Sequence, residues 1–140
     1  MGNERFEAAP LDGPLLDVRD LRTAFKTARG LARAVDGVTF TLERGRTIGI
    51  VGESGSGKSV LSRSIMGLLP RNNVVRSGQA LFEGHDLVQS SDAQLRSLWG
   101  AQMAMVFQDP MTSLNPVMKI GNQITEVLRQ HLDITKDYAK

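Results

Sequence analysis

The stretch TIGIVGESGSGKS, residues 47–59, decides the fold of this chain. Residues 47–51 form an apolar run that is typical of a short buried strand, and residues 52–59 fill every constrained position of the pattern G-x-x-x-x-G-K-[ST]. Downstream, a helix is expected to begin near Lys58, because one apolar stripe recurs at helical spacing and contains Val60, Leu61, Ser64, Ile65, Leu68 and Leu69. The sequence therefore predicts the order of strand, loop and helix in which this pattern binds phosphate.

Each residue type in the loop has a physical reason to be there. The glycines at 52, 55 and 57 allow dihedrals and close approaches that a Cβ would forbid, so that successive N–H groups form an anion-binding nest. Lys58 supplies a mobile positive charge for the β- and γ-phosphates, and the Ser59 hydroxyl is a ligand for Mg²⁺. The predicted site for a nucleoside triphosphate consists of Gly52, Glu53, Ser54, Gly55, Ser56, Gly57, Lys58 and Ser59. The alternative is a Gly/Ser-rich connection in front of a helix.

The composition is that of a globular protein of one domain and excludes several other classes of protein. The chain has 140 residues, which suits one domain, and its 41% hydrophobic and 23% charged side chains are ordinary for a globular protein. No apolar run approaches the roughly 18 residues that span a bilayer, so the chain is not a membrane channel by itself. The formal net charge of +2 is too small to predict a nucleic-acid partner. The absence of cysteine excludes disulfides and fits a reducing compartment.

The organisation along the chain is simple. The N-terminus lacks the apolar core of a secretory signal, which predicts a cytosolic start, and residues 1–14 are expected to be a flexible tail before one domain at 15–140. The expected elements are strands from Leu15 with a turn at 26–30, a strand at 38–42, a strand at 78–87 with a turn at 83–84, a helix at 92–98 capped by Asp92, a buried strand at 103–107 and a helix with an apolar face at 120–131.

A second block, MVFQDPMTSLNP at residues 105–116, gives the loop its context. Together with residues 49–59 it resembles the ATP-binding subunits of ABC transporters, and specifically the branch that imports dipeptides, oligopeptides and nickel. The resemblance runs from about Leu15 to the last residue. It implies an α/β P-loop fold with an N-terminal antiparallel β-subdomain, a parallel core sheet and the start of a helical subdomain.

The resemblance also assigns roles to single residues. Gln108 matches the glutamine that approaches Mg²⁺ and the attacking water in this family, so Lys58 and Gln108 are the implied catalytic residues, and Ser59 and Gln108 the implied metal site. The alternative for Gln108 is a polar loop residue after a buried strand. Phe25 matches the aromatic residue that stacks on adenine, although an aromatic at a strand end is equally often part of the core. His85 and His131 match no catalytic histidine of the family and are expected at the surface or its boundary.

The implied cofactors are ATP and Mg²⁺, and the implied partners are transmembrane permease subunits and a second ATP-binding subunit, identical or different. No nucleic acid is expected. The implied location is the cytoplasmic face of the plasma membrane. The apolar face of residues 120–131 is expected to pack on its own subdomain, with contact to a transmembrane partner as the alternative.

Three family motifs do not occur before Lys140: the LSGGQ-like sequence, the apolar run that ends in Asp-Glu, and the switch histidine. The expectation is therefore a truncated chain that ends in the helical subdomain and binds ATP without turnover. For the complete family member the expected function is ATP hydrolysis coupled to import of peptides or related small solutes. The alternatives are a non-transport ABC ATPase of the DNA repair or translation type, and a catalytically inactive nucleotide-binding fragment.

Overall fold

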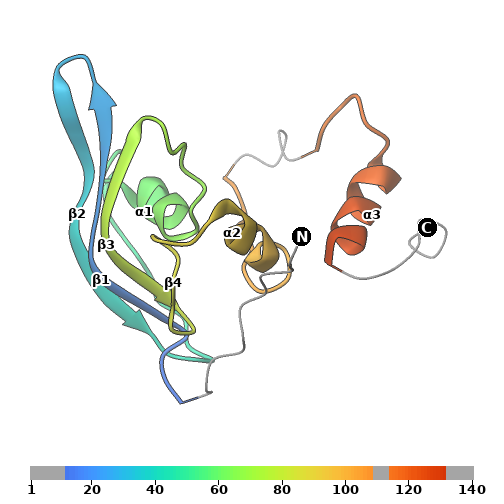
Figure 1. The fold of residues 1–140 in the computed structure, drawn as a ribbon, viewed down its shortest axis with the longest axis horizontal. Helices are drawn as coiled ribbons and strands as arrows, with labels where there is room; N and C mark the ends of the chain where they lie inside the picture. Colours follow the sequence, from blue (N-terminus) through green and yellow to red (C-terminus); the bar gives the residue numbers. More distant parts are fainter. Residues whose placement is uncertain (1–11, 109–113, 132–140) are drawn as a thin grey trace. The chain divides into compact units, whose positions relative to one another are not determined.

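A computed structural model of the protein describes residues 12–108 and 114–131 (Figure 1). The chain divides into two compact units, Met1–Leu95 and Arg96–Lys140, and each is described by itself. Residues 1–11 of the tail expected at 1–14, and residues 109–113 of the second sequence block, lie outside the described residues. Among the described residues, none of the helices combines the length and the apolar character needed to cross a membrane.

The first unit is built on a four-stranded antiparallel sheet with the order β2-β1-β3-β4. Its strands are β1 (Leu16–Thr27), β2 (Gly30–Leu42), β3 (Val74–Phe82) and β4 (His85–Asp86). The predicted turns at 26–30 and 83–84 are confirmed, because β1 pairs with β2 up to Thr27↔Gly30 and β3 pairs with β4 at Phe82↔His85. The strand predicted from residue 78 begins earlier, at Val74.

The sheet is irregular at the same level in three neighbouring strands. Asp20 in β1 has φ 45°, Gly37 in β2 has φ 78°, and Gly78 in β3 has φ 83°. A Cβ on Gly78 would lie 2.2 Å from the Asp20 carbonyl oxygen, so only glycine fits between these strands. Such bulges bend a sheet and increase its twist. Figure 1 shows the resulting curvature, with helix α1 on the concave side of the sheet.

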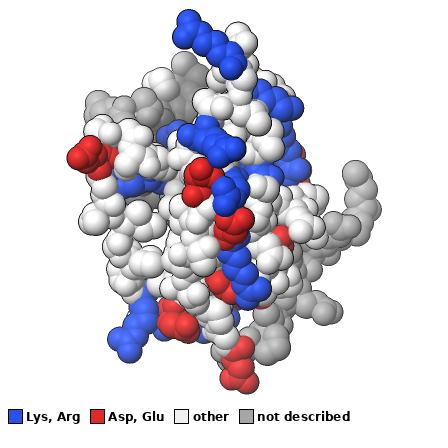
Figure 2. All heavy atoms as spheres, turned by 90° about the vertical axis from the view of Figure 1, so that its left-hand side faces the viewer, with Lys and Arg blue, Asp and Glu red and all other residues white. Residues whose placement is uncertain are grey.

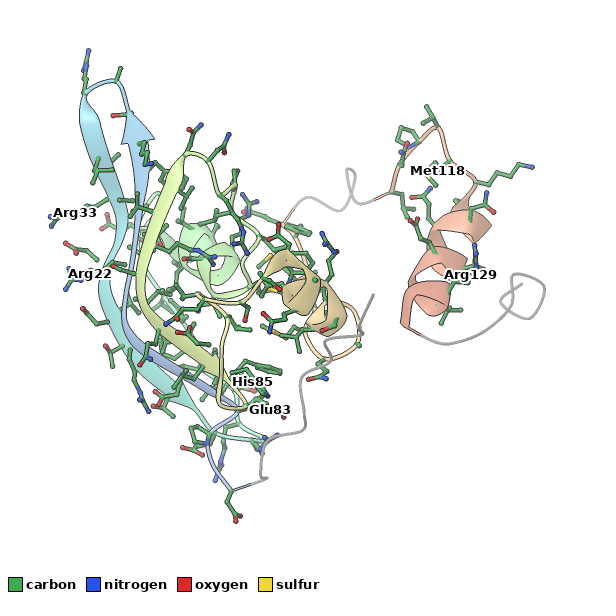
Figure 3. The ribbon with its side chains drawn as sticks, viewed as in Figure 1. Arg22, Arg33, Glu83, His85, Met118 and Arg129 are labelled. Atoms are coloured by element: carbon green, nitrogen blue, oxygen red, sulfur yellow. The ribbon has the colours of Figure 1, made fainter. Side chains whose placement is uncertain are left out.

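The convex side of the sheet carries charges of both signs. Figure 2 shows Lys and Arg interspersed with Asp and Glu along this face, and Figure 3 shows Arg22 and Arg33 pointing away from α1. Arg22 pairs with Asp20 and Asp36, and these contacts raise the pKa of the Arg22 guanidinium, the hydrogen bond to Asp20 contributing most. These groups are largely exposed, so the ion pairs contribute little to stability. The convex side is therefore a solvated face.

Helix α1 (Lys58–Ile65) starts where the sequence predicts and ends earlier than its apolar stripe. Gly67 follows in the left-handed region with φ 70°, and a glycine in this conformation commonly ends a helix. The predicted stripe residues Leu68 and Leu69 therefore lie past the helix. The buried hydrophobic residues of this unit come from the sheet, α1 and the chain that follows: Val18, Leu21, Val35, Leu61, Ile65, Met66, Ala80, Phe82, Leu87 and Leu95.

Helix α2 (Asp92–Leu98) has the predicted bounds, but its cap is not the predicted residue. The Ser91 backbone N–H donates to Gln94 Oε1 at 2.8 Å, and the Gln94 N–H donates to Ser91 Oγ at 3.3 Å, which is a capping box. The prediction that Asp92 is the cap is therefore wrong. Its carboxylate pairs with Arg71 at 2.7 Å instead.

In the second unit, helix α3 (Ile120–His131) has the predicted bounds. The Gln123 side chain fastens the preceding loop to the helix, since it accepts from the Asn115 N–H at 2.8 Å and donates to the Asn115 and Met118 carbonyls at 2.9 and 3.0 Å. Figure 3 places Met118 before the helix and Arg129 on it. Ile120 and Ile124 on the predicted apolar face are each 60% exposed, so packing of this face on its own subdomain is not seen among the described residues.

Two predicted strands of the parallel core sheet are not formed within the described residues. Neither 47–51 nor 103–107 is a strand, apart from a single bridge between Met103 and Trp99. Val51 is 93% and Val106 98% exposed, where burial was expected. A strand exists only through hydrogen bonds to a neighbour, and neither segment pairs with any of the four described strands. Their apolar residues match a buried strand in character, but here they lack the neighbours that would bury them.

Candidate phosphate-binding site

The glycines of the loop at residues 52–59 are required for two reasons. Gly55 and Gly57 have φ 80° and 92°, in the left-handed region where a Cβ is unfavourable. Gly52 has no such φ, but a Cβ there would lie 2.7 Å from Ser56 Oγ. The backbone dihedrals and close approaches that the sequence predicts are therefore both present in the loop.

The last glycine of the loop rests on strand β2. A Cβ on Gly57 would lie 2.4 Å from the Ala34 carbonyl oxygen. Ala34 has no partner in the register with β1, because Thr23 pairs with Val35 and the next residue of β1, Ala24, pairs with Arg33. The extra residue in β2 is a bulge, a feature that redirects the backbone locally. The antiparallel sheet thus contacts the phosphate loop directly.

Lys58 folds back over the loop. Its Nζ atom donates to the Gly52 carbonyl at 2.7 Å, to the Glu53 carbonyl at 2.6 Å and to Ser56 Oγ at 3.2 Å. An ammonium group has three N–H donors, so the loop oxygens account for all of them. These contacts place a full positive charge within the loop. This arrangement suits an anionic ligand.

The start of α1 adds further positive character. Gly57 is the N-cap residue and supplies no side-chain hydrogen bond, and the first turn contains no acidic residue. The first intrahelical bond runs from the Leu61 N–H to the Gly57 carbonyl at 2.8 Å, which leaves the N–H groups of the first turn for another acceptor. With the positive end of the helix dipole, such groups form an anion site.

The donors around the loop also fit Mg²⁺ bound together with phosphate. Ser59 is exposed at the start of α1 and offers a hard oxygen, the ligand type that Mg²⁺ prefers. Within the described residues there is no cluster of three or more His, Asp or Glu side chains that could hold a metal.

Helix α1 is anchored by polar contacts that sequence reasoning missed. Thr23 Oγ1 in β1 lies 2.6 Å from Ser64 Oγ, and both residues are buried. Arg76 Nη1 in β3 donates to the Ser64 carbonyl at 2.9 Å. Burial lowers the pKa of the half-buried Arg76 guanidinium, and the nearby charge of Arg71 acts in the same direction. The one available signal was a serine within an otherwise apolar helical stripe.

Phe25 lies in β1, where it pairs with Ala32 of β2 and Val74 of β3. It follows Thr23 by two residues, so its side chain is on the face of the sheet that carries α1. The residue is half-buried, which is compatible with a stacking surface and with a place at the edge of the core. Its role in adenine binding stays a prediction.

Gln108 is exposed and belongs to the second unit, whereas the phosphate loop belongs to the first. Its catalytic role and its pairing with Ser59 on one metal ion stay predictions. Of the two histidines, His85 is half-buried in β4 at the turn shown in Figure 3, and the side chain of His131 lies outside the described residues.

Comparison with known proteins adds a family context. Residues 35–139 match the family described as ABC transporter. The oligopeptide transport ATP-binding protein OppD of Bacillus subtilis (strain 168) is 53% identical over 127 residues, which cover 90% of this chain and 36% of that protein. OppD of Haemophilus influenzae is 52% identical over 126 residues, with 90% and 39% covered. The dipeptide transport ATP-binding protein DppD of Bacillus subtilis is 47% identical over 127 residues, with 90% and 38% covered. The chain thus spans less than half the length of these relatives.

Proposed function

Because the chain belongs to the ABC transporter family, we propose that residues 52–59 bind ATP with Mg²⁺ and that the chain is the nucleotide-binding part of a peptide importer's ATP-binding subunit. One observation carries the proposal. The Lys58 ammonium group lies inside a loop formed by Gly55 and Gly57 in left-handed conformations, beside a helix start that has no side-chain cap. This combination of positive groups is suited to a polyphosphate.

The residues of the loop have different roles in binding the triphosphate. Lys58 supplies a full charge for the β- and γ-phosphates, while its bonds to the Gly52 and Glu53 carbonyls keep the loop closed around the ligand position. The N–H groups of the first turn of α1 donate to phosphate oxygens. The Ser59 hydroxyl would hold Mg²⁺, which when bound neutralises charge on the β- and γ-phosphates.

Two further residues complete the proposal. Phe25 stacks on the adenine ring from the sheet face that carries α1, and Gln108 approaches the metal and the attacking water. Both assignments come from the family resemblance, and the half-buried position of Phe25 and the exposure of Gln108 are compatible with them.

The transported solute is proposed from the relatives. The names of the three relatives specify oligopeptide or dipeptide transport and ATP binding. We therefore propose peptides as the solute, transmembrane permease subunits and a second ATP-binding subunit as partners, and the cytoplasmic face of the plasma membrane as the location. Coupled ATP hydrolysis is proposed for a protein of the relatives' full length.

Calorimetric titration of the chain with MgATP tests the central claim. Lys58→Ala removes the mobile charge, and loss of a charge-assisted hydrogen bond predicts at least about tenfold weaker binding. Lys119→Ala is the control, because Lys119 is an exposed lysine of the second unit and lies outside the loop. Unchanged ATP affinity in Lys58→Ala, with the circular dichroism spectrum intact, would show that the loop is not the binding site.

A further inference from the structure

A buried hydroxyl pair joins the phosphate-loop helix to the sheet. Ser64 is 0% and Thr23 1% exposed, and their hydroxyl oxygens are 2.6 Å apart. Ser64 lies on a face of α1 whose other buried residues are Leu61 and Ile65. A hydroxyl placed among such residues is costly unless it is paired, so the pair makes the fit of α1 on β1 specific in a way that apolar packing alone does not.

The same residue is held by a second strand. The half-buried Arg76 in β3 donates from Nη1 to the Ser64 carbonyl at 2.9 Å, near the C-terminal end of α1, where a positive charge is favourable. Ser64 is therefore bound through its side chain to β1 and through its backbone to β3. Sliding or rotation of the helix would break both contacts.

The other end of α1 is fixed by a contact of a different kind. Gly57 is against the Ala34 carbonyl in the bulge of β2. Gly57, Leu61 and Ser64 have the spacing i, i+4, i+7, which places them on one face of a helix. One face of α1 thus contacts β2 at its start and β1 and β3 near its end. The rotation of α1 about its own axis is set by both.

We propose that Ser64, held by Thr23 and Arg76, is a positioning residue for the phosphate loop. The inference rests on the proposed function, because it specifies how the loop that binds the triphosphate is aimed. Ser64 follows Lys58 by six residues, roughly 9 Å along a helix, so it does not touch the phosphates itself. It acts through the orientation of α1, which determines where the first-turn N–H groups and Lys58 point.

A purely structural role for Ser64 makes a different prediction, and a pair of variants separates the two. Ser64→Ala leaves the Thr23 hydroxyl buried without its partner, which lowers the stability of the fold. Thr23→Val combined with Ser64→Ala removes both hydroxyls, and replacing both partners by apolar groups of similar shape is close to neutral for stability. Stability should therefore recover in the double variant. The orientation of α1 should not recover, because the specific contact between the two hydroxyls is still missing.

The experiment measures two quantities on the full chain, the midpoint of urea unfolding and the affinity for MgATP by calorimetry. For Ser64→Ala we expect a lower midpoint and about three- to tenfold weaker ATP binding, the equivalent of one hydrogen bond. For the double variant we expect a restored midpoint with ATP binding still weakened, while inorganic tripolyphosphate loses affinity by the same factor. Ser77→Ala, an exposed serine of β3, is the control and should change neither quantity.

Two outcomes overturn the inference: ATP affinity that recovers together with the midpoint in the double variant, or ATP affinity that Ser64→Ala leaves unchanged. If the Ser64 variants do not fold, Arg76→Met decides from the other strand, because it removes the donor to the Ser64 carbonyl without touching either hydroxyl. Unweakened binding in a folded Arg76→Met would then overturn it. Failure of the proposed function is recognised separately, by an unaltered protein that does not bind ATP or by Lys58→Ala that binds equally well.

Discussion

Among single glycine-to-alanine substitutions in the phosphate loop, Gly57→Ala should lower the stability of the fold most. Gly57 has φ 92°, and an alanine forced into the left-handed region costs about 1–2 kcal/mol. The new Cβ would also lie 2.4 Å from the Ala34 carbonyl oxygen, which is backbone and cannot rotate away. Forcing an extra group into a packed site typically costs about 1–3 kcal/mol. The sum, about 2–5 kcal/mol, is a large part of the roughly 5–15 kcal/mol by which a domain is stable.

Gly55→Ala is the matched control, because it isolates the contact with β2. Gly55 has φ 80°, close to that of Gly57, but nothing lies within 4 Å of the position of its Cβ. The two variants therefore share the backbone strain and differ in the collision with Ala34. Urea unfolding followed by circular dichroism should place Gly57→Ala about 1–3 kcal/mol below Gly55→Ala in stability.

Equal losses in the two variants would refute this reasoning, since the contact between the loop and the β2 bulge would then contribute nothing. ATP titration of the same proteins provides a second measurement. The Ala34 carbonyl must move away from the added methyl group or the loop must move away from β2. Because the first turn of α1 starts at this glycine, we expect Gly57→Ala to weaken ATP binding as well.

Two further outcomes follow from the glycines and the exposed apolar residues. Gly78→Ala should lower stability by about 2–5 kcal/mol, because its Cβ would lie 2.2 Å from the Asp20 carbonyl oxygen in addition to the strain of φ 83°. Gly84 has φ 81° and open space around the position of its Cβ, so Gly84→Ala should lower stability in the same urea titration only by the cost of the backbone strain. Equal losses of stability in the two variants would contradict the argument. The chain should also self-associate, because Val51 and Val106 are 93% and 98% exposed, and Val51→Ser with Val106→Ser should increase the monomer fraction in size-exclusion chromatography. A monodisperse unaltered chain at high concentration would refute this expectation.

The elements that sequence analysis placed correctly depend on local information. The turn at Glu83-Gly84, the start of α1 at Lys58 and the bounds of α3 each follow from a turn residue, a motif or a helical period within a few neighbouring residues. The cap of α2 was misassigned within one residue, because Ser91 and Asp92 are both good caps and only the reciprocal bond with Gln94 distinguishes them.

The buried strands predicted at 47–51 and 103–107 fail for a non-local reason. An apolar run such as 47–51 reports that a segment is suited to burial between neighbours, but it does not report whether those neighbours are present. In the described part of the chain Ile50 is 47% exposed and has no partner strand. Periodicity alone could not have revealed this, because the information lies in pairings between distant segments.

The candidate site shows the same division between local and distant information. The glycines of the loop could be predicted because the loop itself requires them, through the left-handed conformation of Gly55 and the close approach of the Ser56 side chain at Gly52. The contacts that orient the loop could not be predicted from the sequence. Thr23 and Ser64 are 41 residues apart, and a threonine in an alternating strand and a serine in a helical stripe are each unremarkable by themselves. A motif thus specifies what the loop can bind, whereas the register of β1 against β2 and the bulge at Ala34 specify where it points. For that reason substitutions at Thr23 and Ser64, outside the motif, are the sharper test of how this fold supports its site.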